Sequence, residues 1–168
     1  MAAAITQVDP SQNEFLADLE KKAKRANHFF RTMANRPDVL KNFPPLYGAV
    51  MGPGSVDRRT KELVYLTVSY TNQCAYCTAA HTAGAARAGI SEAEMQALRT
   101  GQLDGFSASE QAAIRYADEL TKTANVNSTR DQLRSHFNDE QTVELTLVAA
   151  MANFTNRFNN GLAVQPEQ

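Results

Sequence analysis

The sequence predicts a single all-α domain of seven to eight helices. Apolar residues recur at helical spacing in almost every segment of the chain. Ser91–Glu94 and Ser107–Glu110 are helix-start pairs, each followed by an apolar run. Residues 64–68 would also suit a strand, but no other segment offers a strand to pair with it. With no linker in residues 1–168, the chain is expected to fold as one domain around one core.

The helix limits follow from caps, glycines and prolines. Ser11 with Glu14 forms a predicted capping box before an apolar stripe that runs to Met33. Pro44–Pro45 is expected to end the second helix, and Gly89 the fourth. The expected helices cover residues 14–33, 37–44, 57–69, 74–88, 91–101, 107–122, a short segment from 128, and a last one from about 139 with an apolar stripe at Val143, Leu147, Met151, Phe154 and Phe158.

The charge balance argues against a nucleic-acid or anionic-membrane partner. The chain has 17 Lys and Arg against 18 Asp and Glu, which gives a formal net charge of -1. The basic cluster in residues 21–25 fits a solvated helix face. Residues 1–12 lack the pattern of a secretory signal, and no stretch is long and apolar enough to span a bilayer. We therefore expect a cytoplasmic protein.

The informative segment contains Cys74, Cys77 and His81 on one expected helix. Steps of three and four residues place all three side chains on the same helix face. Helical residues at i and i+3 have Cα atoms about 5 Å apart, within the range that a disulfide accepts. In a reducing compartment, a C-x-x-C pair indicates redox chemistry or metal binding more often than a structural staple.

The position of the cysteines at a helix start favours a thiolate. Unpaired backbone N–H groups and the helix dipole stabilise a negative charge in the first turn. A cationic His81 one turn further along would add to this effect and favours Cys77 as the attacking sulfur, while the dipole alone favours Cys74.

Glu62 is expected on the preceding helix among apolar residues. A carboxylate there is costly to bury unless it has a partner or holds a proton. The expected partner is His81, either directly or through water. A Glu that orients a His, which in turn accepts a thiol proton, is a general-base arrangement for a thiol nucleophile.

Other interpretations of these residues remain open. Cys74 and Cys77 could be small buried hydrophobic residues, or they could bind zinc together with His81 and Glu62. A thioredoxin fold is not expected because the βαβ pattern is missing. Three function classes follow: a thiol peroxidase, a disulfide reductase or redox sensor, and a non-redox relative.

The order E-x(11)-C-x-Y-C-x(3)-H resembles the core of the AhpD-like alkylhydroperoxidases, in the carboxymuconolactone decarboxylase superfamily. The resemblance is closest over residues 57–98 and looser over 36–54 and 153–157. It implies an AhpD-like helical bundle, assembled as a homo-oligomer (trimer or hexamer), that reduces hydroperoxides through thiols. It also implies no bound cofactor and an external dithiol donor, such as dihydrolipoamide or a thioredoxin-like protein.

The resemblance also implies roles for the motif residues. Cys77 would be the peroxidatic cysteine and Cys74 the resolving one, with Glu62 and His81 as the proton relay. The best-known members carry a His between the cysteines, where this chain has Tyr76. Because Tyr76 lies between the two cysteines, we expect it to line the substrate pocket. The decarboxylase branch is similar in fold but does not depend on the cysteine pair.

Two further patterns in the sequence lie outside the motif. One is a repeated set of four residues at the same spacing: Asp57, Thr60, Glu62 and Leu63, then Asp139, Thr142, Glu144 and Leu145. This repeat suggests a duplicated helical hairpin, in which Glu144 is the structural counterpart of Glu62. Asn153, Asn156 and Arg157 form either a buried polar network or a subunit contact, and the sequence leaves both open. Tyr47 and Tyr65 are expected in the core or at an interface.

Overall fold

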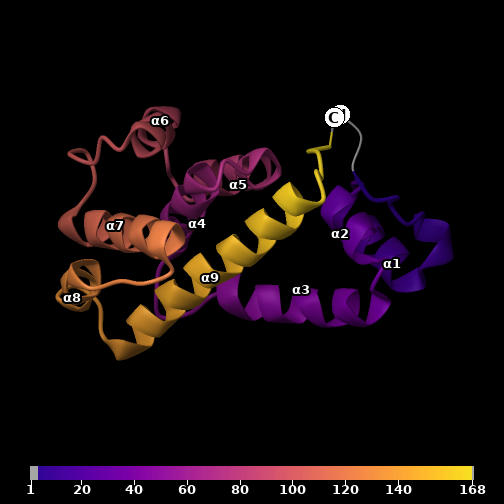
Figure 1. Ribbon diagram of the computed structural model, residues 1–168, viewed down its shortest axis with the longest axis horizontal. Helices are drawn as coiled ribbons and strands as arrows, with labels where there is room; N and C mark the ends of the chain where they lie inside the picture. Colours follow the sequence, from indigo (N-terminus) through magenta and orange to yellow (C-terminus); the bar gives the residue numbers. More distant parts are fainter. Residues whose placement is uncertain (1–3, 168) are drawn as a thin grey trace.

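The computed structural model describes residues 4–167, and loops join the helices that make up its secondary structure over that range (Figure 1). The described chain has nine α-helices and one short 3₁₀ helix, without a strand. They are η1 (Pro10–Gln12), α1 (Glu14–Ala23), α2 (His28–Met33), α3 (Pro37–Met51), α4 (Arg58–Thr71), α5 (Ala75–Arg87), α6 (Glu92–Thr100), α7 (Ala108–Thr123), α8 (Ser128–Arg134) and α9 (Asp139–Gly161). The all-α prediction is confirmed.

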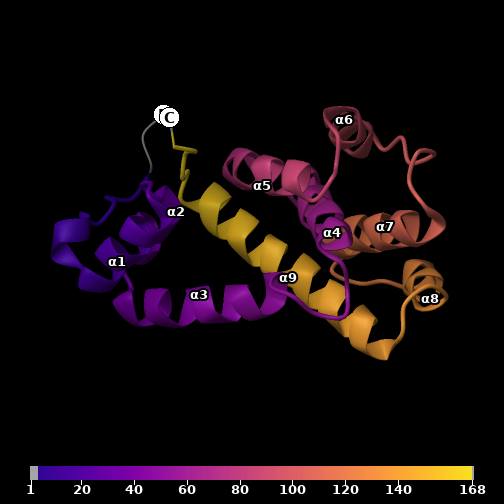
Figure 2. The ribbon, with the colours of Figure 1, turned by 180° about the vertical axis from the view of Figure 1, so that it is seen from behind.

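The long helix α9 runs through the middle of the molecule in both views (Figures 1 and 2). It packs against α3, α4, α5 and α7, while α4 also packs against α5 and α7. Helices α1 and α2 lie at one end beside α3, and α6 to α8 lie at the other end (Figure 2). None of the described helices has the length and hydropathy needed to cross a membrane.

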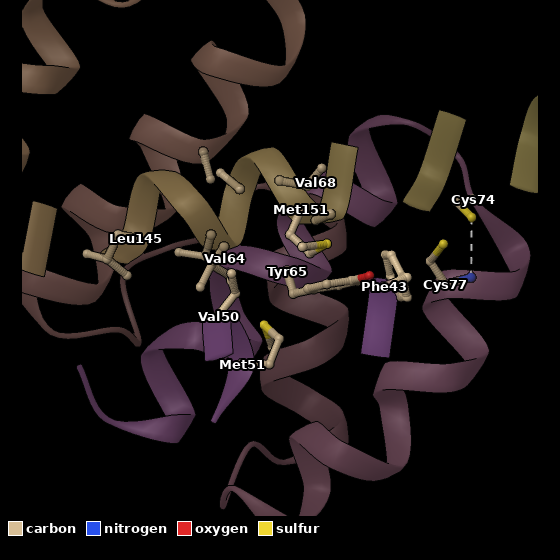
Figure 3. Close-up of a cluster of buried hydrophobic side chains, with 14 of the residues drawn as sticks. Phe43, Val50, Met51, Val64, Tyr65, Val68, Cys74, Cys77, Leu145 and Met151 are labelled. Carbon is tan, nitrogen blue, oxygen red and sulfur yellow. Dashed lines mark hydrogen bonds between the residues drawn. The ribbon is translucent and has the colours of Figure 1, made fainter. Parts of the chain in front are cut away.

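Helix α4 is the most deeply buried element, with every residue from Thr60 to Ser69 in the interior. This explains its strand-like, nearly continuous apolar composition, because a helix enclosed on all sides has no solvent face. Val64 and Val68 of α4 meet Leu145 and Met151 of α9 in the main core (Figure 3). A smaller cluster around Leu63 and Leu66 joins α4 to α5, α6 and α7.

The first predicted helix, over residues 14–33, is two helices. Lys24 ends α1 with a left-handed φ of 54°, and α2 starts after Asn27, whose side chain accepts a hydrogen bond from Phe30 N. The predicted Ser11–Glu14 capping box is also wrong, because Asn13 caps α1 and Ser11 lies in η1. An asparagine cap inside an apolar stripe restarts the helix in a new direction, which accounts for nine helices instead of eight.

The prediction that Pro44–Pro45 ends a helix is wrong as well. Helix α3 continues through both prolines to Met51. Proline removes a backbone donor and crowds the preceding turn, but its φ is compatible with a helix. The packing of α3 against α2 and α9 holds the helix together across these two positions.

The predicted apolar stripe of α9 is only partly buried. Met151 lies in the core, but Val143, Leu147 and Phe154 have exposed fractions of 58%, 48% and 48%. Leu145, Val148, Ala149 and Ala152 supply the buried face. Helix α9 is thus apolar on two faces, and the periodicity alone does not distinguish the inner one.

The predicted repeat does not extend to a second hairpin. Asp57 caps α4, whereas Asn138 and not Asp139 caps α9, so the two sets are one residue out of step. Helix α5 follows α4, but α9 is the last helix of the described residues.

Glu144 anchors the loop before α4 to α9. Its carboxylate pairs with the buried Lys61 ammonium and accepts hydrogen bonds from Ser55 N (2.8 Å) and Val56 N (3.1 Å). Lys61 Nζ also donates to the Gly52 carbonyl at 2.7 Å. This pair fixes the entry of the chain into α4.

Replacing Lys61 by Met should lower the free energy of unfolding by about 3–5 kcal/mol, because Glu144 would lose its buried partner. Chemical denaturation followed by circular dichroism measures the change. Lys122→Met is the matched control, since the exposed Lys122–Asp118 pair should contribute no more than about 0.5 kcal/mol. Equal effects of the two substitutions would contradict a structural role for the buried pair.

Candidate active site

The two cysteines lie at the start of α5, as the sequence predicts. Cys74 is the N-cap residue, and its Sγ accepts a hydrogen bond from Cys77 N at 3.3 Å (Figure 3). Gln73 precedes it with a left-handed φ of 52°, which separates α5 from α4. A thiol therefore takes the capping position that a Ser or Asn hydroxyl or amide usually fills. Both thiols are buried and reduced.

An asparagine network holds the turn between α4 and α5. Asn72 Nδ2 donates to Asn153 Oδ1 at 3.0 Å and to Asn156 Oδ1 at 3.1 Å. Asn160 Nδ2 donates to the Asn72 carbonyl at 2.8 Å, and Arg157 donates to Asn153 Oδ1. Of the two interpretations of Asn153, Asn156 and Arg157, the intramolecular polar network is present within this chain.

Cys77 is poised to be a thiolate near neutral pH. The hydrogen bond from the Cys74 thiol is the main cause that lowers the pKa of Cys77 to about 7, despite burial. Amide and hydroxyl donors of α9 add to this effect, including Asn159 Nδ2 at 3.3 Å from the sulfur. Donating that hydrogen bond, together with burial, raises the pKa of Cys74. The pair therefore contains one nucleophile and one protonated thiol.

The expected pairing of Glu62 with His81 is present. Glu62 has no solvent exposure, and its Oε2 accepts from His81 Nδ1 at 2.7 Å while its Oε1 accepts from Arg58 Nη2 at 2.5 Å. Burial alone would raise the pKa of Glu62, but the bonds and charges of His81 and Arg58 outweigh it, and the net direction is downward. Glu62 is thus a carboxylate with both oxygens paired.

The His81 ring is held on both nitrogens. Nδ1 bonds Glu62, and Nε2 forms a hydrogen bond with the Tyr47 hydroxyl at 3.0 Å. Burial and the charge of Glu62 raise the pKa of Tyr47, so its hydroxyl keeps its proton. The Tyr65 ring stacks on the imidazole with centroids 3.5 Å apart. The sequence placed His81 beside Cys77 as its direct base, whereas here His81 bonds Tyr47.

Gly84 sets the distance between α4 and α5 at this point. A Cβ atom at Gly84 would lie 2.8 Å from Glu62 Oε1, which is too close for any real contact. The glycine is therefore required for the approach of the α5 backbone to the buried carboxylate.

Cys77, His81, Glu62 and Tyr47 all line one cavity of about 300 Å³. Phe29, Phe30, Phe43 and Tyr76 form an aromatic wall of the same cavity. Tyr76 lines this cavity, and its hydroxyl donates to Glu167, another lining residue, at 2.9 Å. Among the described residues, no group of three or more His, Cys, Asp and Glu side chains is arranged to hold a metal ion.

Comparisons with known proteins agree with this geometry. The model of the carboxymuconolactone decarboxylase family matches residues 37–119, a span that holds Glu62, both cysteines and His81. The uncharacterized protein YdfG of Bacillus subtilis (strain 168) is 30% identical over 109 residues, which are 62% of this chain and 74% of YdfG.

Two solved structures share the fold. The alkylhydroperoxidase AhpD core of an uncharacterized peroxidase-related protein from Ralstonia eutropha JMP134 superposes with a TM-score of 0.83 at 21% identity, over 99% of this chain and 93% of that one. The debrominase Bmp8 gives a TM-score of 0.84 at 21% identity, over 97% and 91%. The chain belongs to the carboxymuconolactone decarboxylase family. Within this family it has the AhpD-like fold, and the resemblance noted from the sequence is confirmed.

Tyr47, Gly84 and Asn159 are the residues of this carboxymuconolactone decarboxylase family site that the sequence analysis missed. Asn159 lies on α9, 82 positions from Cys77, and nothing in its sequence surroundings marks it. Its Oδ1 is buried without a hydrogen-bond partner, and the residue lines the cavity beside Cys77. An unpaired buried acceptor is costly, and it therefore indicates a position for a donor from a bound molecule.

Titration of the thiolate by ultraviolet absorbance should show one group ionising at about pH 7, since thiolate forms as pH rises through the pKa of Cys77. Replacing Asn159 by Leu removes a donor to the sulfur and should move this midpoint up, toward the ordinary value of about 8.5.

Asn160→Leu is the matched control, because Asn160 bonds the Asn72 carbonyl and not the sulfur. A midpoint that stays at about 7 in Asn159→Leu would remove Asn159 from the control of thiol reactivity.

Proposed function

We propose that this protein is a thiol-dependent peroxidase that reduces organic hydroperoxides through the Cys74–Cys77 pair. One observation carries the proposal: Cys77, whose pKa is lowered, lines an aromatic cavity. The hydrogen-bonded residues Glu62, His81 and Tyr47 line the same cavity. Membership of the family and the AhpD-like fold support the assignment to this class.

The proposed chemistry assigns a role to each sulfur. The Cys77 thiolate attacks the terminal oxygen of the hydroperoxide, the O–O bond breaks, and Cys77 becomes a sulfenic acid while the alkoxide leaves. The alkoxide takes a proton from the Tyr47 hydroxyl, which regains one from solvent, while Glu62 holds the imidazole that Tyr47 bonds. The Cys74 sulfur then attacks the Cys77 sulfur and a disulfide forms. The hydroxyl group of the sulfenic acid leaves with the Cys74 proton as water.

The cavity favours an apolar hydroperoxide over a very polar substrate. Its aromatic wall suits an alkyl or aryl group, while the unpaired Asn159 Oδ1 accepts the hydrogen of the –OOH group. This position places the terminal oxygen beside Cys77, because Asn159 Nδ2 already bonds that sulfur.

An external dithiol, such as dihydrolipoamide or a thioredoxin-like protein, would return two electrons to the disulfide. Because sulfur carries both electrons, the proposed cycle needs no bound cofactor. If peroxide oxidises the two thiols but is not consumed catalytically, the protein is a disulfide reductase or redox sensor. If both thiols remain unchanged after treatment with peroxide, the protein is a non-redox relative.

A second candidate function is reductive dehalogenation of a small aromatic ring. The debrominase Bmp8 has this fold and binds 2,3,4-tribromopyrrole, and the aromatic wall here suits a planar ring. In that reaction a carbon–halogen bond becomes a carbon–hydrogen bond, halide and a proton leave, and two thiols become a disulfide. Halide release without peroxide would favour this candidate.

We also propose that the protein is a homo-oligomer, either a trimer or a hexamer. Val39 and Leu46 of α3 and Val143, Leu147 and Phe154 of α9 are large apolar residues with exposed fractions of 39–58%. Helices α3 and α9 lie side by side, so these residues gather on neighbouring helices. Such a surface is typical of one that a second copy covers.

Cumene hydroperoxide should be consumed catalytically when a dithiol donor is present, and the oxidised protein should weigh about two daltons less than the reduced one. With Cys74→Ser, one equivalent should leave a sulfenic acid on Cys77 that dimedone traps. With Cys77→Ser, Cys74 should react far more slowly, because burial still raises the pKa of its thiol. A trapped sulfenic acid on Cys74 with an inert Cys77 would show that the assignment is inverted.

Glu62→Gln should slow peroxide reduction by roughly 10²–10⁴, because Gln cannot supply the negative charge that Glu62 places beside His81 Nδ1. Both the rate and its dependence on pH should change in this variant. A purely structural defect would lower the rate without changing the pH dependence. Thermal unfolding of the variant provides the control for folding. An unchanged rate and pH profile would remove Glu62 from the mechanism.

A further inference from the structure

The two cysteines open onto different cavities. Cys77 lines the aromatic cavity described above, whereas Cys74 lines a separate groove of about 950 Å³, and the two share no lining residue. The start of α5 forms the wall between them. Ala79 faces the groove and its neighbour Ala80 faces the aromatic cavity.

The groove differs from the aromatic cavity in charge and in shape. Its walls come from α4, α5, α6 and α7, and its apolar floor includes Leu98, Leu103 and Ile114. Arg99, Arg115 and Lys122 line it against a single acid, Asp118, which pairs with Lys122 at 2.7 Å. The two remaining guanidinium groups make the groove attractive to a thiolate or another anion.

We infer that this groove is the entry site of the reductant, which attacks Cys74 from the side opposite to the hydroperoxide. A thiolate of the dithiol attacks Cys74 Sγ, the Cys74–Cys77 bond breaks, and Cys77 leaves as a thiolate with the electron pair of that bond. The second thiol of the reductant then attacks its own sulfur in the mixed disulfide. Cys74 is released and takes up a proton, and the reductant departs as a cyclic disulfide.

Thiol–disulfide chemistry favours this direction. The sulfur that leaves is the one with the lower pKa, and attack then falls on the other sulfur of the bond. Side chains of α9 stabilise the Cys77 thiolate, whereas Cys74 Sγ has only backbone N–H donors at the start of α5. The groove gives access to the sulfur at which attack is favoured.

The depth of Cys74 selects the kind of reductant. Its exposed fraction is 1%, so a reductant that reaches this cysteine must enter through the groove that it lines. A slender dithiol on an apolar chain can enter between α5, α6 and α7, whereas a folded redox protein would meet the helices first. We therefore assign the groove to a small dithiol of the dihydrolipoyl type.

This inference rests on the proposed redox use of the cysteine pair, and the test separates the two. Diamide, a thiol oxidant, prepares the disulfide without any peroxide. The reduction of this disulfide by dihydrolipoamide and the oxidation of the reduced protein by cumene hydroperoxide are then measured as separate reactions. Failure of peroxide oxidation alone would overturn the proposed function and leave the reductant site standing.

Three substitutions on α5 place the same bulk at three positions with different surroundings. Ala79→Phe fills the groove, Ala80→Phe fills the aromatic cavity, and Ala83→Phe lies on an exposed position that lines neither. Reduction by dihydrolipoamide should slow by about tenfold or more in Ala79→Phe, with a much smaller effect on oxidation. Ala80→Phe should slow oxidation by cumene hydroperoxide much more than reduction by dihydrolipoamide. Ala83→Phe should leave both rates equal to those of the unmodified chain. Equal reduction rates in Ala79→Phe and Ala83→Phe would overturn the inference.

Trapping identifies the sulfur that is attacked. The oxidised protein is treated with 2-mercaptoethanol and iodoacetamide together, and the peptide that holds both cysteines is analysed by fragmentation mass spectrometry. The expected product carries the mercaptoethanol disulfide on Cys74 and the alkyl group on Cys77. The opposite distribution would overturn the inference. Reduction by thioredoxin as fast as by dihydrolipoamide would overturn the assignment to a small dithiol.

Discussion

The carboxylate of Glu62 lies between α4 and α5 with no access to water, and a buried charge of this kind is tolerated only when its oxygens are paired. Arg58 and His81 meet that requirement from two helices. Gly84 allows the close approach, and the Tyr65 ring covers the imidazole from one face. The register of α5 against α4 is therefore fixed at the turn that follows Cys77, which in turn fixes the direction of both sulfurs.

The two glutamates that share a sequence pattern satisfy the same electrostatic requirement in different ways. Glu144 is bound by the Lys61 ammonium and by backbone N–H groups of the loop before α4, and it has no contact with the cavity. Glu62 is bound by side chains that reach the cavity through His81 and Tyr47. One carboxylate joins two helices, and the other orients a proton donor, although both sit near the start of an apolar helix.

Local chemistry was sufficient to predict most helix starts. Asp57, Ser91 and Ser107 each cap a helix at the predicted position. The errors arose where tertiary packing overrode local preference, as in α3 across its two prolines, or where a non-glycine residue, Lys24, adopts a left-handed conformation. Neither feature has a marker in the sequence, because the stabilising contacts come from distant segments.

The candidate active site could likewise be predicted where local chemistry decides, but not where folding brings distant residues together. Glu62 and His81 could be paired from sequence because an isolated carboxylate in an apolar helix demands a partner and His81 shares a face with the cysteines. The low pKa of Cys77 was anticipated, but its cause was not, since the donors are Cys74 and α9 instead of His81. Tyr47 and Asn159 approach the site through folding alone.

The dependence of Cys77 on α9 has a consequence for the newly made chain. Asn159 donates to the sulfur, Asn156 and Thr155 also lower its pKa, and all three belong to α9, which follows α5 by more than 50 residues along the chain. Until that helix docks, the chain carries two ordinary thiols that are mostly protonated at neutral pH. Reactivity toward oxidants therefore arises only after α9 has docked against α5, which protects the partly folded polypeptide from premature oxidation.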